Sequence, residues 1–167
     1  GSFFPVAVTL VSASGDSGGA CSFQVEVRDV EAPVLTVDAH PSILWPPNHR
    51  MIDAHASWFS SDNCPGVQVH LDSVTSSEPD DAPGSGDGNT SGDIQGASPG
   101  LADADVSLRA EREGEGAGRT YSLAYSASDA AGNVTASSAA VFVPHDQSGV
   151  IGPLSLTLMP EGAWAAG

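Results

Sequence analysis

The sequence predicts an all-β protein: an antiparallel β-sandwich with an extra hairpin before it and one more strand after it. Three observations carry this prediction. Apolar and polar residues alternate along many short stretches, helical periodicity is nearly absent, and glycine (19 residues) and proline (12 residues) recur between the stretches. A period of two is typical of strands that bury one face, and glycine and proline mark the turns between them.

The first 32 residues predict a β-hairpin. Apolar residues alternate in FPVAVTLV (4–11) and again in CSFQVEVRDV (21–30), and the Gly/Ser-rich stretch 12–19 is typical of a hairpin loop. A two-stranded hairpin is not stable alone in water. We therefore expect residues 1–32 to pack on the middle of the chain, on a missing neighbour or on another copy.

The middle segment, 33–145, predicts about seven strands, the number in an immunoglobulin-like sandwich. The proline-rich LWPPNH at 44–49 cannot join a β-ladder, because proline has no N–H to donate. Residues 78–103 show no clear strand, and so long a loop indicates either function or disorder. A first strand is expected to begin at Pro33, and others at 50–59, 66–76, 104–112, 119–128 and 133–143.

Residues 146–167 predict a linker and a tail. Within them LSLTLM, at 154–159, alternates leucine with serine and threonine, which predicts one more strand that needs a partner sheet.

The charge is strongly acidic and restricts the partners. There are 21 aspartates and glutamates against five arginines, with no lysine, for a net charge of −16. Such a field repels phosphate, so nucleic acid and anionic membranes are not expected as partners, and cations are the natural counter-species. No stretch approaches the roughly 20 apolar residues that a membrane span needs.

The run GSGDGNTSGD, residues 84–93, predicts a calcium-binding loop. Oxygen-bearing residues occupy every second position among glycines, as in the first half of a DxDxDG loop, although Ser98 stands where an EF-hand has its bidentate acid. Nearby acids can supply the missing charge, and the alternative is a solvated polar turn. The predicted calcium ligands are Glu78, Asp87, Asn89, Ser91 and Asp93.

A second candidate cation site lies at the junction between the hairpin and the middle segment. Asp29, Glu31, Asp62 and Asp129 are the acids placed there, although no pattern in the sequence shows that they converge.

No catalytic set is apparent, and we do not expect an enzyme. GDSGG at 15–19 resembles the nucleophile turn of chymotrypsin-like proteases, with Ser17 as nucleophile. In those enzymes the histidine and aspartate precede the serine, whereas all five histidines here follow it. No histidine forms an HxH or HExxH pair for zinc, and hydrogen bonding is the expected role of His49 and His145.

Several unusual sequence motifs occur in a characteristic order: ILWPPNHRM, SDNC, SVTSSEPDD, GDGNTSGD, LRAEREGEGAGRTYSLAYSASDAAGNV and VPHDQ. Residues 33–147 thereby resemble a bacterial extracellular immunoglobulin-like module. SASGDSGGACSFQVEVRDVEAPV resembles the end of a hyalin-repeat (HYR) module, so residues 1–32 are similar to the last hairpin of an upstream repeat. The resemblance implies a secreted or surface-anchored protein and does not imply catalysis.

The same resemblance bears on the two cysteines. In HYR-like modules the SDNC cysteine, here Cys64, pairs with a late cysteine that this chain lacks, and Cys21 is separated from its upstream partner. A Cys21–Cys64 disulfide, within one chain or between two, and a pair of free thiols both stay open.

The resulting expectation is a non-catalytic structural or adhesive module, stiffened by calcium, whose partners are neighbouring modules or copies of the same chain. One alternative is a fibre subunit that assembles by β-strand addition. Another is a carbohydrate-binding module that uses Trp45 and Trp164, with a glycan or surface protein as partner. Trp45 is expected to cover one end of the sandwich; Trp58, Tyr121 and Tyr125 are expected in the core.

Overall fold

The structure is a computed structural model of the chain. The described part contains nine β-strands and no helix, which confirms the all-β prediction there. The predicted strand at 154–159 and Trp164 lie outside it. The structure describes residues 2–11, 14–15, 17–84 and 86–146, without the side chains of 2–4, 9–11 and 17–21.

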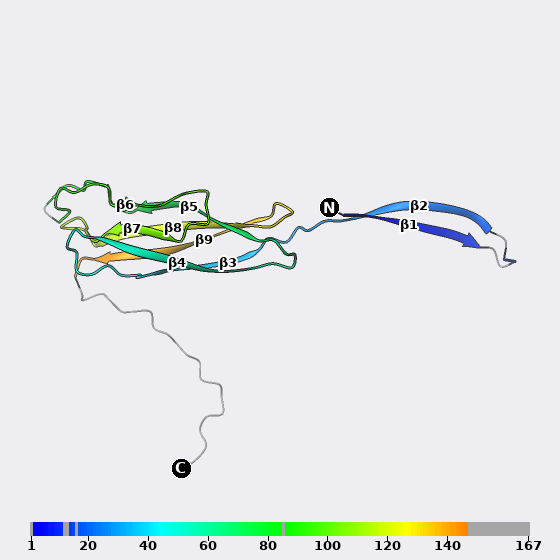
Figure 1. Cartoon of the computed structure of the whole chain (residues 1–167), viewed down its shortest axis with the longest axis horizontal. Helices are drawn as coiled ribbons and strands as arrows, with labels where there is room; N and C mark the ends of the chain where they lie inside the picture. The colour runs from blue at the N-terminus through cyan, green and yellow to red at the C-terminus, as the bar shows by residue number, and fades with distance from the viewer. Residues whose placement is uncertain (1, 12–13, 16, 85, 147–167) are drawn as a thin grey trace, which may run out of the picture.

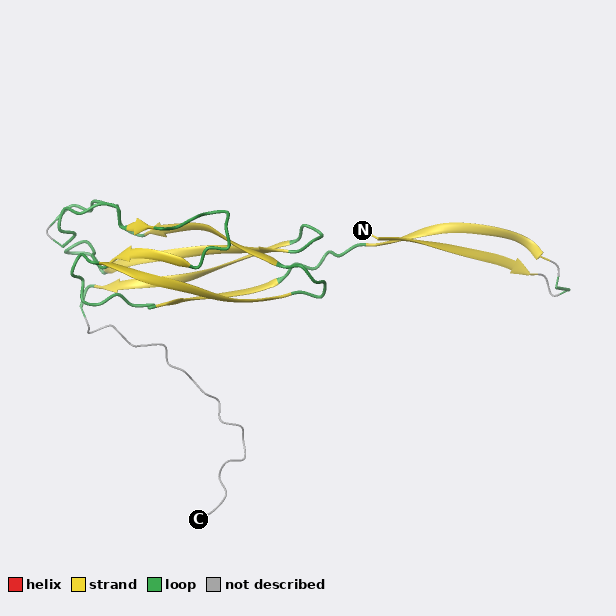
Figure 2. Ribbon diagram, in the orientation of Figure 1, coloured by secondary structure: helices red, strands yellow, loops and turns green. Residues whose placement is uncertain are grey.

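Strands β3 to β9 form two packed sheets (Figures 1 and 2). One sheet has the order β3-β4-β7-β6 and the other β5-β8-β9, with antiparallel neighbours throughout. Constant-type immunoglobulin domains have this strand order. The strands are β3 (Val34–His40), β4 (Met51–Ser61), β5 (Gln68–Ser76), β6 (Ile94–Gln95), β7 (Asp105–Arg109), β8 (Gly118–Ser128) and β9 (Val134–Pro144).

The alternation in the sequence places one face of each sheet in the core. Along β8 every second residue from Arg119 to Ala127 is buried, and Leu35 and Val37 of β3 are buried in the opposite sheet. Half-buried Trp58 packs on Tyr125 with ring centroids 5.5 Å apart. Burial of these apolar side chains is the main favourable term that holds the sheets together.

The predicted strands agree with the observed ones within a few residues, except in two places. β7 ends at Arg109, before the predicted end at residue 112. β6 is a two-residue strand inside the segment where no strand was predicted, because two residues are too few to show alternation.

The segment after β3 runs alongside the last strand. Ile43 forms a parallel bridge with Phe142; the Leu44 N–H donates to Phe142 O at 2.8 Å, and the Phe142 N–H donates to Ser42 O at 2.9 Å. Leu44 is buried in the core, whereas Trp45 is 42 % exposed. Leu44 therefore takes the buried position in this segment, and the covering of one end of the sandwich by Trp45 stays a prediction.

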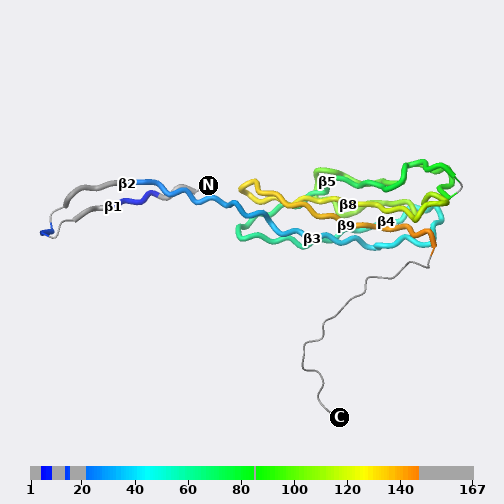
Figure 3. Tube along the Cα trace, turned by 180° about the vertical axis from the view of Figure 1, so that it is seen from behind, coloured from blue at the N-terminus to red at the C-terminus, as the bar shows by residue number. Residues whose placement is uncertain are grey.

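The first two strands stand outside the sandwich. β1 (Ser2–Val11) pairs with β2 (Ser17–Val27) in an antiparallel hairpin, which we call the hairpin arm, and in the described part of the chain it pairs with no other strand. Figures 1 and 3 show it projecting from one end of the sandwich. Phe23 is 50 % exposed on this arm, so part of its apolar surface faces solvent.

Candidate functional site

Residues 77–93 connect β5 to β6 as a long loop, at the end of the sandwich opposite the hairpin arm (Figure 1). Asp80 closes this loop: its carboxylate accepts hydrogen bonds from the backbone N–H of Asp93 at 2.8 Å and of Gly92 at 2.9 and 3.0 Å. These bonds, that from Asp93 first, lower the pKa of Asp80. The two ends of the loop are therefore tied by a charged side chain.

The loop folds around Arg119, whose side chain is 0 % exposed on the core face of β8. Its guanidinium donates to Asp87 Oδ1 at 2.7 Å and to Glu78 Oε2 at 3.1 Å. It also donates to Asp93 Oδ2. Burial disfavours its charge, but hydrogen bonds with Tyr121 and Asp93 outweigh this and raise the pKa of Arg119. Arg119 is thus a buried cation among loop carboxylates.

Arg109, at the end of β7, holds the same loop from its other side. Its Nε lies 3.1 Å from Asp93 Oδ1, and its Nη2 donates to the carbonyl oxygen of Ser91 at 2.8 Å. A third bond, of 3.1 Å, runs from Nη1 to the carbonyl oxygen of His49. Arg109 of one sheet and Arg119 of the other therefore both pair with Asp93.

Glu111 is the third fully buried carboxylate, with 0 % exposure. Its Oε2 accepts a hydrogen bond from the Thr90 hydroxyl and lies 3.1 Å from His49 Nδ1. Its Oε1 is buried without a hydrogen-bond partner among the described residues; the closest arginine nitrogens are Arg109 Nε at 3.8 Å and Arg119 Nη1 at 3.9 Å. Burial raises the pKa of Glu111.

The structure separates the five predicted calcium ligands. Asp87 and Asp93 are buried and converge, but on a set completed by Glu111: one oxygen from each of these three residues lies within 4.8 Å of the others. We call Asp87, Asp93 and Glu111 the carboxylate cluster. Glu78 instead accepts hydrogen bonds from Arg119 and from the backbone N–H of Glu113. Asn89 and Ser91 have exposed side chains, outside the buried cluster.

Sequence reasoning missed Arg119, Arg109 and Glu111. One signal was available for Arg119, because it shares the face of β8 that carries Tyr121 and Leu123. An arginine on an apolar strand face needs buried counter-charges. No comparable pattern pointed to Glu111, which lies just after β7.

A second acidic group lies where the hairpin arm meets the sandwich. Ligand atoms of Asp29, Asp62 and Cys64 lie within 4.8 Å of one another, and we call these residues the junction cluster. Asp29 Oδ2 and Asp62 Oδ1 are buried atoms without hydrogen-bond partners in the described part. Of the other predicted junction acids, Glu31 accepts a bond from Asn63 Nδ2 (2.8 Å), and Asp129 accepts bonds from Asn133.

Cys64 is free and exposed, so the structure does not contain the Cys21–Cys64 disulfide. Cys21 lies opposite Val8 in the projecting hairpin arm, and its side chain is outside the described residues. A hydrogen bond with Asp29 raises the pKa of the Cys64 thiol. A raised pKa lowers the thiolate fraction and thus the reactivity of this cysteine.

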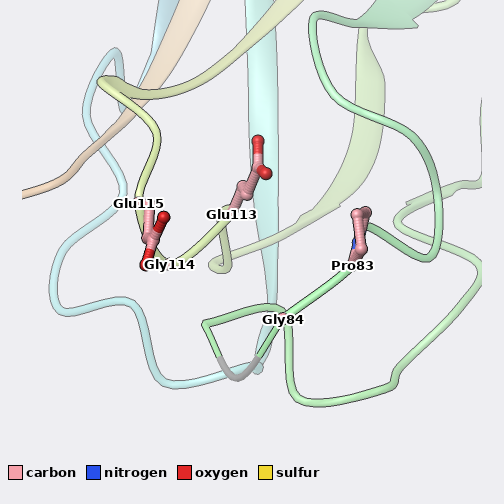
Figure 4. A pocket seen from close by; sticks show the side chains of 5 residues that line it. All are labelled: Pro83, Gly84, Glu113, Gly114 and Glu115. Atoms are coloured by element: carbon pink, nitrogen blue, oxygen red, sulfur yellow. The ribbon is translucent and has the colours of Figure 1, made fainter.

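An open pocket of about 500 Å³ lies between the loop around Pro83 and the turn at Glu113–Glu115 (Figure 4). Its lining offers two carboxylates and two glycines besides the proline.

The histidines named above are engaged in hydrogen bonds: His49 with Glu111, and His145 Nε2 with the carbonyl oxygen of Gly114 at 3.1 Å. Both histidines therefore have the hydrogen-bonding role expected of them.

Comparison with models of known protein families, with curated proteins and with solved structures finds no match for this chain. In the described part of the chain no helix is long and apolar enough to cross a membrane.

Proposed function

We propose that this chain is a non-catalytic structural or adhesive module of a secreted or cell-surface bacterial protein. In this proposal an immunoglobulin-like sandwich is one unit in a line of modules. The motifs LWPPNH, SDNC and VPHDQ support it, because they resemble motifs of bacterial extracellular modules. The order of the strands in the two sheets supports it as well.

The observation that carries the proposal is the direction of the first and last strands. The parallel bridge between Ile43 and Phe142 means that the segment after β3 and the end of β9 run the same way. The chain therefore comes into the sandwich at one end and leaves it at the other, as Figure 1 lets the reader follow. Modules with this geometry join end to end into an extended chain.

Small-angle X-ray scattering on two copies of the full chain fused head to tail tests this proposal. The expected particle is rod-like, with a maximum dimension close to twice that of one copy. A compact particle, in which the two sandwiches lie side by side, would contradict the role of a spacer. The same scattering on the unfused chain supplies the reference dimension.

A fibre subunit is the second candidate, and the exposed apolar residues of the hairpin arm favour it. Phe23, Val25 and Val27 are 50 %, 41 % and 58 % exposed, and strand addition to a neighbour would cover such residues. This candidate predicts assemblies that grow with protein concentration in light scattering. A monomer at every concentration would exclude it.

Carbohydrate binding is the third candidate and depends on Trp45, which is 42 % exposed. Tyr121 and Tyr125 are 0 % exposed and cannot stack on a sugar. A glycan array tests this candidate: binding that Trp45→Ala abolishes would support it, and an array without hits would exclude it.

A further inference from the structure

The unpartnered oxygen of Glu111 is the observation that leads beyond a purely structural role. The side chain is 0 % exposed, and its Oε1 has no hydrogen-bond partner in the described part of the chain. The other oxygen is already used by Thr90 and His49. A buried carboxylate oxygen without a donor is costly, because it has lost its water and gained no replacement. A cation from solution would satisfy it.

The carboxylate cluster has the dimensions of a calcium site. One oxygen from each of Asp87, Asp93 and Glu111 lies within 4.8 Å of the others, and all three residues are buried. Calcium binds oxygens at about 2.3–2.6 Å, so two ligands on opposite sides of one ion are about 5 Å apart. The distances among the three oxygens therefore fall within the range of ligands around one ion.

The charges around the cluster are also unbalanced. Four carboxylates face two guanidinium groups and the imidazole of His49, so the acids outnumber the groups that can carry a positive charge in this largely buried region. A cation reduces this excess, and unbalanced buried charge is strongly unfavourable. The carboxylates are those of Glu78, Asp87, Asp93 and Glu111, and the guanidinium groups are those of Arg109 and Arg119.

The donor atoms select the kind of ion. All three ligands are carboxylates, which suit hard cations, whereas zinc favours sulfur and nitrogen ligands. The nearest imidazole, His49, faces Oε2 of Glu111 and not the free Oε1. Magnesium demands near-octahedral geometry and keeps several waters, which a buried cluster of carboxylates does not favour. We propose that Asp87, Asp93 and Glu111 bind one calcium ion.

The ion and the arginines can share the same carboxylates. Each carboxylate oxygen has two lone pairs, so Asp87 Oδ1 and Asp93 Oδ2 can accept from Arg119 and still bind a cation. Glu111 Oε1 contributes the one oxygen that has no hydrogen bond. The inference does not rest on the proposed spacer role, because the ion would bind in a single module as well as in a chain of them.

Thermal unfolding of the full chain, in EDTA and then in millimolar calcium chloride, tests the site. A ligand that binds only the folded state raises the melting temperature. We expect a rise of several degrees that Glu111→Gln abolishes. Glu115→Gln is the matched control, because it removes the same charge from an exposed residue nearby and should leave the rise intact. The readout is the calcium-dependent shift, so a changed baseline stability does not confuse it.

Asp87→Asn is the second variant, for use if Glu111→Gln does not fold, and it should also abolish the rise. Asp62→Asn asks whether the ion binds at the junction cluster instead. The proposal is overturned if calcium causes no rise in the unmodified chain. It is equally overturned if the rise survives in Glu111→Gln, or if Asp62→Asn is the variant that removes it.

Discussion

Arg119 is the residue on which the loop 77–93 depends. Its guanidinium is fully buried, and it donates to carboxylates that lie 26 to 41 residues away in the sequence. Burying one charge alone would be prohibitive, so the arginine and its acids are stable only together. A single side chain in the core thereby fixes the path of a glycine-rich segment that has almost no regular structure of its own.

Arg119→Met should therefore be strongly destabilising. It keeps much of the side-chain volume but leaves Asp87 buried without its counter-charge and Asp93 with Arg109 alone, a change that typically costs about 3–5 kcal/mol. Urea unfolding measures the loss. Arg50→Met is the matched control, because Arg50 is exposed, and its unfolding midpoint should stay close to that of the unmodified chain. Equal effects in both variants would refute the buried role of Arg119.

Two glycines allow backbone strain and steric contact to be separated. Gly88 and Gly96 both have positive φ, 71° and 79°, so alanine costs roughly 1–2 kcal/mol at either position. A Cβ on Gly88 would also lie 2.8 Å from the ring of His49, whereas a Cβ on Gly96 meets nothing within 4 Å. Gly88→Ala should thus lower the unfolding free energy more than Gly96→Ala. A larger loss in Gly96→Ala would show that His49 does not pack there.

At the scale of single residues, the sequence predicted part of the candidate site. Spacing among glycines singled out Asp87 and Asp93, and both are buried in the structure. It could not show that Asn89 points to solvent, because the direction of a loop side chain depends on what lies beneath it. Nor could it pair Asp93 with Arg119, since local patterns carry no information about contacts between distant strands.

At the scale of the elements, one carboxylate closes the loop 77–93, whereas the alternation of apolar and polar residues determines the strands. Asp80 is exposed, yet it accepts backbone hydrogen bonds from both Gly92 and Asp93. β8 shows regular alternation over its whole length and was predictable for that reason. β6 pairs only Ile94 and Gln95 with β7, so it arises from the closed loop and not from a strand pattern.

Closure by Asp80 should depend on pH. Its folded-state pKa lies below the ordinary 3.8, so the carboxylate stabilises the loop above that value, and the stabilisation is lost as the pH falls through the lower pKa. Asp80→Asn should reproduce the acid state at neutral pH. Hydrogen exchange at the amides of Gly92 and Asp93 should then be faster. Unchanged exchange at both amides would show that other contacts close the loop.

For the molecule as a whole, the hairpin arm and the sandwich form two separate sets of strands. In the described part, no strand pair joins β1 or β2 to the two sheets. The 33–145 range predicted for the sandwich could be read from alternation and from the Asp29–Pro33 junction. The direction in which the arm points could not, because it depends on contacts that no local pattern encodes.

Deleting residues 1–28 should leave the sandwich folded with nearly the same melting temperature. Among the side chains that the structure describes, the core contains residues from β3 to β9 and none from the arm. Calorimetry on the shortened chain measures this. A fall of many degrees would mean that the arm packs on the sandwich in solution, and circular dichroism would then show whether the remaining strands persist.

The parallel bridge at Ile43 and Phe142 has a mechanical consequence for a module held at its two ends. Tension would draw the segment after β3 and the end of β9 in opposite directions along their common axis. The two bonds at Phe142 would then be sheared together and not unzipped one after the other. Single-molecule pulling from the two termini should give a higher unfolding force than pulling across neighbouring antiparallel strand ends. The seam between these segments would be the part of the fold that resists the pull.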